Sequence, residues 1–186
     1  EAPELEPVTV KIHENAIAKT KVRSPIIGTD PDDGDVLTYT ITADDSFGKL
    51  ALHLRSGVIY VTDKGGCKKS DAGVYAHCEP LNFEMEPLYN FTVRVTDQNG
   101  LWSENDVRVS IIDVNEPPTI TDQSRNVLEN PEPLSLIGAP LPSFDIDSGP
   151  NGEVGYSIDS QELCAVGKTC QALAEPIFGI DRSTGQ

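Results

Sequence analysis

Short runs in which apolar and polar residues alternate cover most of the first part of the chain, and helical spacing is almost absent. Alternation with a period of two is typical of strands that bury one face and expose the other. The pattern predicts strands at 5–13, 22–29, 37–42, 50–54, 57–62, 89–97 and 106–114. Such a set, about seven short strands in about 115 residues, predicts an all-β sandwich of the immunoglobulin-like kind. Asn99-Gly100 predicts a type I′ hairpin turn between the last two strands, because both central residues of that turn need positive φ.

The sequence repeats itself at an offset of 115 residues. His-Glu-Asn around Glu14 aligns with Leu-Glu-Asn around Glu129, and Asp-Pro-Asp from Asp30 aligns with Asp-Ile-Asp from Asp145. A period of this length fits one whole domain, because the repeats of solenoids run to about 20–50 residues. We therefore expect two tandem domains, at 1–115 and 116–186. The second is expected to be incomplete at its C-terminal end, which would make the chain an interior piece of a longer array.

Acidic residues dominate the charge of the chain. It holds 30 Asp and Glu against 14 Lys and Arg, so its formal net charge is −16 at pH 7. Nucleic acids are excluded as partners, because phosphate binding needs a basic surface, and cations are the natural ligands. No apolar run approaches the roughly 18 residues of a membrane-spanning helix, so this piece is expected to be soluble. No nucleophile elbow, phosphate-binding loop or zinc-protease motif occurs, and we expect no enzyme activity.

Four cysteines form two close pairs, Cys67 with Cys78 and Cys164 with Cys170, without the Cys-x-x-Cys spacing of zinc and thioredoxin-like sites. This arrangement favours two local disulfides, formed in an oxidising compartment. The first pair closes either a stapled surface loop or a loop that contacts a partner. Asn90 begins the sequon Asn-Phe-Thr and is a candidate glycosylation site. Together these features predict an extracellular protein.

Many carboxylates fall at the ends of predicted strands. Because successive antiparallel strands end at opposite poles of a sandwich, these carboxylates should collect in two groups. One pole should hold Asp30, Asp32 and Asp97, and the other Glu14, Glu84 and the segment 113–116. Two carboxylates about 4 Å apart repel by about 4 kcal/mol at an effective dielectric constant of about 20, so a bound cation would reverse an unfavourable interaction. Calcium fits best, since it accepts many oxygen ligands in irregular geometry, whereas zinc and copper prefer His and Cys.

These motifs, in this order, resemble those of the extracellular cadherin repeat, and the resemblance covers the whole chain. The XEX motif of the family is matched around Glu14 and Glu129, and its DXD motif from Asp30 and from Asp145. Residues 113–116, Asp-Val-Asn-Glu, match the DXNDN linker motif, and Asp97 matches the strand-F aspartate. The resemblance implies tandem Greek-key β-sandwiches, with a calcium-binding linker at the C-terminal end of the first.

The resemblance also implies which residues bind calcium. Up to three ions would be held between the two repeats by Glu14, Asn82, Glu84, Asp113, the carbonyl of Val114, Asn115, Glu116, Asp145, Asp147 and the carbonyl of Asn151. Asp30, Asp32 and Asp97 would serve a linker that precedes the first repeat. Asn82 and Glu116 each replace an aspartate of the family pattern, so we expect the outermost of the three sites to be weakened.

Membership of this family would make the chain a calcium-dependent adhesion or recognition module, in which calcium stiffens the linker between repeats. Its partner would be another cadherin or a different cell-surface protein, in homophilic or heterophilic contact. The full-length protein would be anchored in a membrane at the cell surface. The alternative is a non-adhesive spacer, under tension or in the matrix, built from the same calcium-stiffened repeats.

Overall fold

The structure is a computed structural model that describes residues 1–66, 79–164, 169–173 and 176–186. Within these residues all regular elements are β-strands apart from one short 3-10 helix, η1 (Gly149–Gly152), which confirms the all-β class. The chain divides into two compact units, which we call unit 1 (Glu1–Val114) and unit 2 (Asn115–Gln186). The repeat boundaries expected from the offset, 1–115 and 116–186, stay a prediction.

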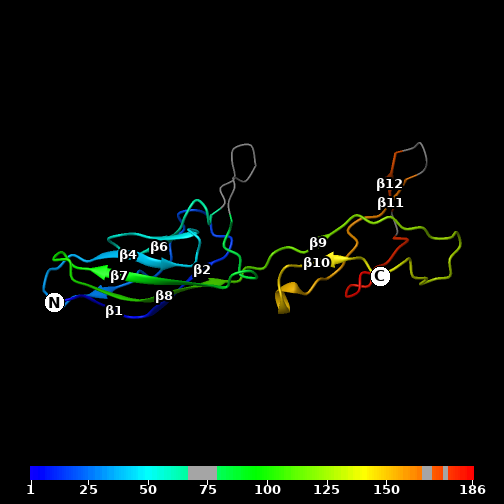
Figure 1. Cartoon of the computed structure of the whole chain (residues 1–186). Helices are drawn as coiled ribbons and strands as arrows, with labels where there is room; N and C mark the ends of the chain where they lie inside the picture. Colours follow the sequence, from blue (N-terminus) through cyan, green and yellow to red (C-terminus); the bar gives the residue numbers. More distant parts are fainter. Residues whose placement is uncertain (67–78, 165–168, 174–175) are drawn as a thin grey trace. The chain divides into compact units, whose positions relative to one another are not determined.

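The main sheet of unit 1 has four strands in the order β2, β8, β7, β4 (Figure 1). These strands are β2 (Val8–His13), β4 (Thr38–Asp44), β7 (Leu88–Thr96) and β8 (Trp102–Ile112). Figure 1 shows β7 and β8 as neighbouring arrows that point in opposite directions. In contrast, β2 and β8 are parallel, with His13 opposite Ile112, so both strands end at the same pole of the unit. This pairing brings Glu14 and Asp113, the residues directly after the two strands, to that pole.

Two shorter strand pairs complete unit 1. They are β1 (Glu4–Leu5) with β3 (Gly28–Thr29), and β5 (Leu50–Leu52) with β6 (Ile59–Val61). The expected strand at 22–29 is therefore wrong except for its last two residues. Pro25 lies inside it, and proline offers no backbone N–H and restricts the residue before it. Val22 and Ile26 still donate backbone N–H groups to the carbonyls of Ile59 and Gly57, at 2.9 and 2.8 Å.

The core of unit 1 follows the period of two that the sequence predicts. Alternate residues of β7 and β8 face inward and are almost inaccessible to solvent, while their neighbours are exposed or partly buried. The buried side chains of these two strands are Tyr89, Phe91, Val93, Val95, Val107, Val109 and Ile111. This packed centre fixes the strand ends, and thereby the carboxylates that follow them.

Unit 2 contains two short antiparallel pairs, β9 (Thr119–Ile120) with β10 (Ser143–Phe144) and β11 (Glu162–Leu163) with β12 (Gln171–Ala172). A disulfide joins Cys164 to Cys170 beside β11 and β12. The other predicted pair, Cys67 and Cys78, lies outside the described residues. In the part of the chain that the structure describes, no helix has the length and apolar character needed to cross a membrane.

Candidate metal centre

Glu14 lies at the pole of unit 1 where β2 and β8 end, and backbone donors hold both of its carboxylate oxygens. Its backbone N–H donates to the carbonyl of Ile112 at 3.0 Å and so extends the pairing of β2 with β8. Its Oε2 accepts the N–H of Phe83 at 2.9 Å, and its Oε1 accepts the N–H of Val114 at 2.7 Å. The side chain is only 2% exposed. Two backbone donors, one on each carboxylate oxygen, hold this side chain in one orientation.

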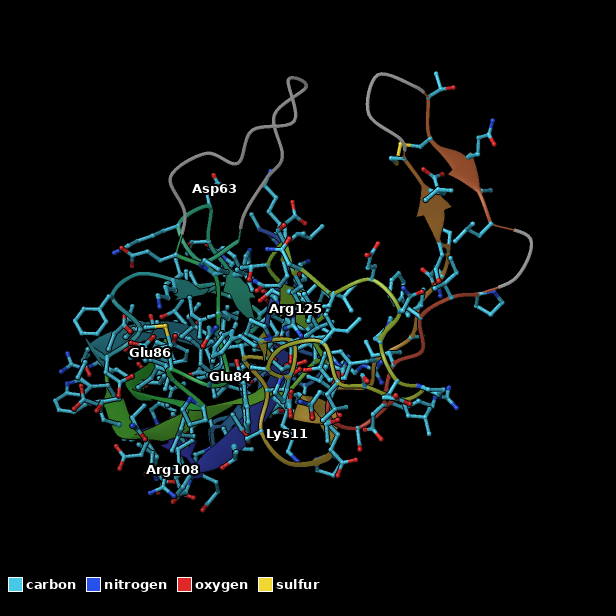
Figure 2. The ribbon with its side chains drawn as sticks, turned by 90° about the vertical axis from the view of Figure 1, so that its right-hand side faces the viewer. Lys11, Asp63, Glu84, Glu86, Arg108 and Arg125 are labelled. Atoms are coloured by element: carbon cyan, nitrogen blue, oxygen red, sulfur yellow. A yellow bond between two sulfur atoms is a disulfide. The ribbon has the colours of Figure 1, made fainter. Side chains whose placement is uncertain are left out.

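Two further carboxylates join Glu14. Ligand oxygens of Glu14, Glu84 and Asp113 all lie within 4.8 Å of one another, and the last two residues are partly buried. Two oxygens bound to one calcium ion at about 2.3–2.6 Å can be at most about 5.2 Å apart, so this spacing fits a shared ion. The structure thus brings together the three carboxylates that the strand-end pattern assigned to this pole. Figure 2 labels Glu84, which lies in the segment between β6 and β7.

Asn82 has a role in the turn that presents Glu84. Its Oδ1 accepts the N–H of Met85 at 2.7 Å, and its backbone carbonyl accepts the N–H of Glu86 at 3.0 Å. These bonds close a tight turn around Glu84, as short polar side chains commonly do. The expected role of Asn82 as a calcium ligand stays a prediction.

Unit 2 holds its own pair of aspartates near its first residues. Oδ1 of Asp145 accepts the N–H of Asp147 at 3.0 Å, and Oδ2 of Asp147 accepts the N–H of Glu116 at 2.8 Å. Asp147 is 8% exposed, and its Oδ1 is buried without a hydrogen-bond partner among the described residues. Because an unpartnered buried carboxylate oxygen is costly, its position fits a metal ligand. Asn151 lies in η1, the helix that follows this pair.

The opposite pole of unit 1 is built around Asp97, in the connection between β7 and β8. Oδ1 of Asp97 accepts the N–H groups of Asn99 and Leu101, both at 2.8 Å. The expected type I′ turn is wrong, because Gly100 has φ +89° whereas Asn99 is not among the residues with positive φ. The Asp97 side chain instead organises a loop of five residues, 97–101, between the paired Thr96 and Trp102.

Asp97 gathers two other aspartates, and one of them was not predicted. Ligand oxygens of Asp30, Asp35 and Asp97 lie within 4.8 Å of one another. Asp32, which the sequence assigned to this pole, is not in the group: its side chain is 48% exposed and accepts a hydrogen bond from the amino group of Glu1. In the sequence, Asp35 is the last acidic residue of the run Asp-Pro-Asp-Asp-Gly-Asp, shortly before β4 begins at Thr38.

The fold and the sequence both have known counterparts. The structure superimposes on the protocadherin gammaB7 EC3-6 cis-dimer structure with a TM-score of 0.67 and 20% identity, over 100% of this chain and 43% of that one. It also superimposes on mouse cadherin-23 EC22-24, with a TM-score of 0.60 and 19% identity, over 99% of this chain and 51% of that one. In sequence, the chain is 31% identical to protocadherin-19 of Danio rerio over 186 residues. The chain consists of cadherin repeats.

Other curated relatives agree with this assignment, although no protein-family model matches the chain. Cadherin-related family member 1 of Gallus gallus is 30% identical over 184 residues, and human protocadherin Fat 1 is 27% identical over 170 residues. These two alignments cover 95% and 89% of this chain, and the protocadherin-19 alignment covers 96%. The chain spans only 15%, 17% and 3% of protocadherin-19, cadherin-related family member 1 and protocadherin Fat 1, respectively.

Cadherin repeats are adhesion-type extracellular modules and not enzymes, as the sequence predicted. Asn90, the glycosylation candidate, is exposed on β7. Its Nδ2 donates to Oδ2 of Asp45 at 3.0 Å, and its backbone N–H donates to Oδ1 of Asp45 at 2.7 Å. Glycosylation of Asn90 stays a prediction.

One carboxylate of this cadherin repeat has a protein cation of its own. Oε2 of Glu86 accepts hydrogen bonds from Nζ of Lys49 at 2.8 Å and from the hydroxyl of Tyr89 at 2.5 Å. These two hydrogen bonds, that of Lys49 first, lower the pKa of Glu86, and burial raises the pKa of Tyr89. Glu84 and Glu86, both labelled in Figure 2, are two residues apart but belong to different groups. Glu86 is satisfied without a metal ion.

Proposed function

We propose that this chain is a calcium-dependent adhesion or recognition module, in which calcium ions stiffen the junction between two successive cadherin repeats. The observation that carries the proposal is the group of Glu14, Glu84 and Asp113. Their oxygens lie within 4.8 Å of one another, and Asp113 is the second-last residue of unit 1. A cluster of this charge at the point where the chain enters the next repeat calls for a divalent cation shared by both.

Residues of both units would hold the ions. Unit 1 would contribute Glu14, Glu84, Asp113 and the carbonyl of Val114, with Asn82 beside them. Unit 2 would contribute Asn115, Glu116, Asp145, Asp147 and the carbonyl of Asn151. The buried, unpartnered Oδ1 of Asp147 supports this set, because a cation would satisfy it. Calcium would supply positive charge and several open coordination positions for oxygen ligands.

The residues of the chain account for the mechanical effect. Without a cation, the carboxylates on the two sides of the segment 115–119 repel one another. Pro117 and Pro118 in that segment fix φ and favour extended backbone, so the junction bends only partly. With calcium bound, the same carboxylates attract a common charge, and the junction becomes stiff. A stiff array is what an adhesive ectodomain needs to present a partner-binding surface to another cadherin or cell-surface protein.

Calorimetric titration of the 186-residue chain with calcium tests the binding. We expect at least one site with a Kd below about 10 mM, ten times the weak limit of extracellular calcium modules. Asp113→Asn, and as a second variant Glu84→Gln, should weaken this site about tenfold, because ligand charge sets affinity. The control is Glu6→Gln, which removes the same charge from an exposed position. Glu14 is avoided, because an amide there would face the N–H groups of Phe83 and Val114.

Two results would overturn the proposal. One is the absence of any calcium site below about 10 mM, and the other is an equal effect of Asp113→Asn and Glu6→Gln. Stiffening is tested separately by small-angle X-ray scattering. When calcium is added, the range of maximum particle dimensions that fits the scattering curve should narrow, because fewer orientations of the two repeats remain. Bead aggregation by the full ectodomain then separates adhesion from a spacer role, since only an adhesive protein aggregates beads in calcium.

A further inference from the structure

We propose that Asp35 is a calcium ligand at the pole of unit 1 opposite Glu14. It would add to Asp30 and Asp97 a side-chain carboxylate that the matching loop of unit 2 does not have. We call Asp30, Asp35 and Asp97 the Asp35 site. The inference rests on the proposed function, since it assumes that the carboxylate groups of these repeats bind calcium.

All three carboxylates of the Asp35 site have the same arrangement. In each, Oδ1 accepts a hydrogen bond. Oδ1 of Asp30 accepts the N–H of Asp32 at 2.8 Å, and Oδ1 of Asp97 accepts the N–H of Asn99 at 2.8 Å. Oδ1 of Asp35 accepts the side-chain amide of Gln98. In each, Oδ2 is buried and has no hydrogen-bond partner among residues that the structure describes.

The burial of Asp97 makes this arrangement unfavourable without a cation. Asp97 is only 5% exposed, so its open oxygen cannot be satisfied by bulk water as a surface carboxylate would be. Within the described ranges, no ion pair involves any of the three carboxylates. Their ligand oxygens lie within 4.8 Å of one another, inside the limit of about 5.2 Å for two ligands of one calcium ion. The geometry therefore fits a cation in place of the missing donor.

The loop of unit 1 explains how Asp35 reaches this position. Tyr39 and Tyr156 mark equivalent points in the two units. The Tyr39 hydroxyl accepts the N–H of Gly28 at 3.0 Å, and the Tyr156 hydroxyl forms a hydrogen bond of 2.7 Å with the side chain of Ser143. Ser143 is the counterpart of Gly28, because it lies 115 positions later in the chain. From the first aspartate of the motif to this tyrosine, unit 1 has nine residue steps and unit 2 has eleven. The shorter loop turns sharply at Gly34, with φ +88°, a conformation that glycine adopts without strain.

The two loops also differ in charge. Between Asp147 and Tyr156 the only acidic residue is Glu153, which follows η1, whereas the loop of unit 1 carries Asp35 directly after its turn. The side chain of Gln98, next to Asp97, donates to Asp35 and holds it toward the group. Since the affinity of calcium sites rises with the number of charged ligands, Asp35 should make this pole a tighter site than two aspartates alone would.

Terbium luminescence gives a readout of this pole when the light excites tryptophan and not the five tyrosines of the chain. Tb³⁺ replaces calcium at oxygen sites and is sensitised by a nearby tryptophan, and Trp102 is the single tryptophan of the chain. Trp102 directly follows Leu101, whose N–H binds Asp97. Titration of the 186-residue chain with Tb³⁺, and displacement of Tb³⁺ by calcium, should therefore report the Asp35 site. We expect Asp35→Asn to weaken both affinities about tenfold.

Asp33→Asn is the matched control, because it removes the same charge from an exposed position in the same loop and should change the affinity less than about twofold. If Asp97→Asn weakens terbium binding but Asp35→Asn behaves like Asp33→Asn, the inference is wrong while the proposed function stands. If the wild-type chain shows no sensitised terbium, the inference is wrong too, and calorimetry of Asp113→Asn decides the proposed function independently. Urea unfolding followed by Trp102 fluorescence checks that each variant is folded.

Discussion

Units 1 and 2 begin alike and differ in their interiors. In unit 1, β1 pairs with β3 so that Leu5 stands opposite Gly28, and in unit 2, β9 pairs with β10 so that Ile120 stands opposite Ser143. Both residues of the second pair lie 115 positions after those of the first. The register of the opening strands is thus the same in both units, which indicates that local sequence is enough to set it.

The aspartate turns repeat in the same way. The N–H of Asp32 donates to Asp30 at 2.8 Å, and the N–H of Asp147 donates to Asp145 at 3.0 Å. The backbone nitrogen of Glu1 contacts Asp32 just as that of Glu116, 115 positions later, contacts Asp147. A short polar side chain can close such a turn without help from the rest of a domain. The turn at each pair of aspartates therefore forms from nearby residues.

The buried core of unit 1, in contrast, depends on residues that lie far apart in the sequence. Leu5 is 6% exposed, whereas Ile120, its counterpart, is 57% exposed. In unit 1, β7 and β8 supply most of the buried side chains, while the described residues of unit 2 include no strands of that length and no buried apolar side chain. The comparison teaches that the start of a repeat forms its pairings from nearby residues, but gains a core only through strands much later in the chain.

The largest expected difference between the units follows from this burial. Leu5→Ala should lower the free energy of unfolding of unit 1 by about 2–5 kcal/mol, because it leaves a cavity in a packed core. Ile120→Ala should change the stability of unit 2 by less than about 0.5 kcal/mol, as expected for an exposed side chain. Urea unfolding in calcium-free buffer, followed by Trp102 fluorescence for unit 1 and far-ultraviolet circular dichroism for both units, measures the two changes. Equal effects would show that unit 2 has a core of its own.

Alternation along the chain was sufficient to predict the all-β class and most of the strands of unit 1. The inward residues of β7, such as Phe91 and Val93, could be identified because the period of two reflects burial directly. The strand-end argument also placed Glu14, Glu84 and Asp113 at one pole, since strand direction fixes which ends meet.

The errors arose where a side chain or a proline competes with the backbone pattern. Pro25 interrupts the strand expected at 22–29, although Val22 and Ile26 on either side of it are buried. At Asn99-Gly100 the Asp97 carboxylate takes two backbone N–H groups and imposes a longer loop than the dipeptide predicts. Asp35 was missed because its contact with Gln98 depends on a turn that residue spacing does not reveal.

Substitution of the matching tyrosines, Tyr39 and Tyr156, should change the stability of the two units by less unequal amounts. Tyr39→Phe removes the acceptor of the Gly28 N–H and should cost unit 1 about 1–2 kcal/mol, because Tyr39 is buried. Tyr156→Phe removes hydrogen bonds to Ser143 and to the Leu141 carbonyl in a more exposed setting, and should cost about 0.5–1 kcal/mol in unit 2. In calcium-free buffer the Trp102 unfolding curve should shift for Tyr39→Phe only. A shift for Tyr156→Phe would show that the units unfold together even without calcium.

The smallest expected difference between the two units is in the pH at which acid begins to destabilise them. Hydrogen bonds lower the pKa of Glu86 in unit 1 through Lys49 and Tyr89, and lower the pKa of Asp181 in unit 2 to about 2 through Ser183 and Thr184. A group whose pKa is lowered on folding stabilises the folded state above its ordinary pKa and loses that contribution as the pH falls toward the folded value.

Unit 1 should therefore lose the Glu86 contribution once the pH falls below about 4.5, the ordinary pKa of Glu. Because the Glu86 side chain is 34% exposed, we expect a loss of no more than about 1 kcal/mol. Glu86→Gln should remove this part of the pH dependence of the Trp102 unfolding curve, whereas the exposed control Glu6→Gln should leave the Glu86 contribution in place.

The turn around Asp181 is exposed and should persist until the pH approaches about 2, as amide exchange of Ser183 and Thr184 would report. If the stability of Glu86→Gln falls with decreasing pH as steeply as that of the wild type, the acid sensitivity of unit 1 comes from its other carboxylates instead.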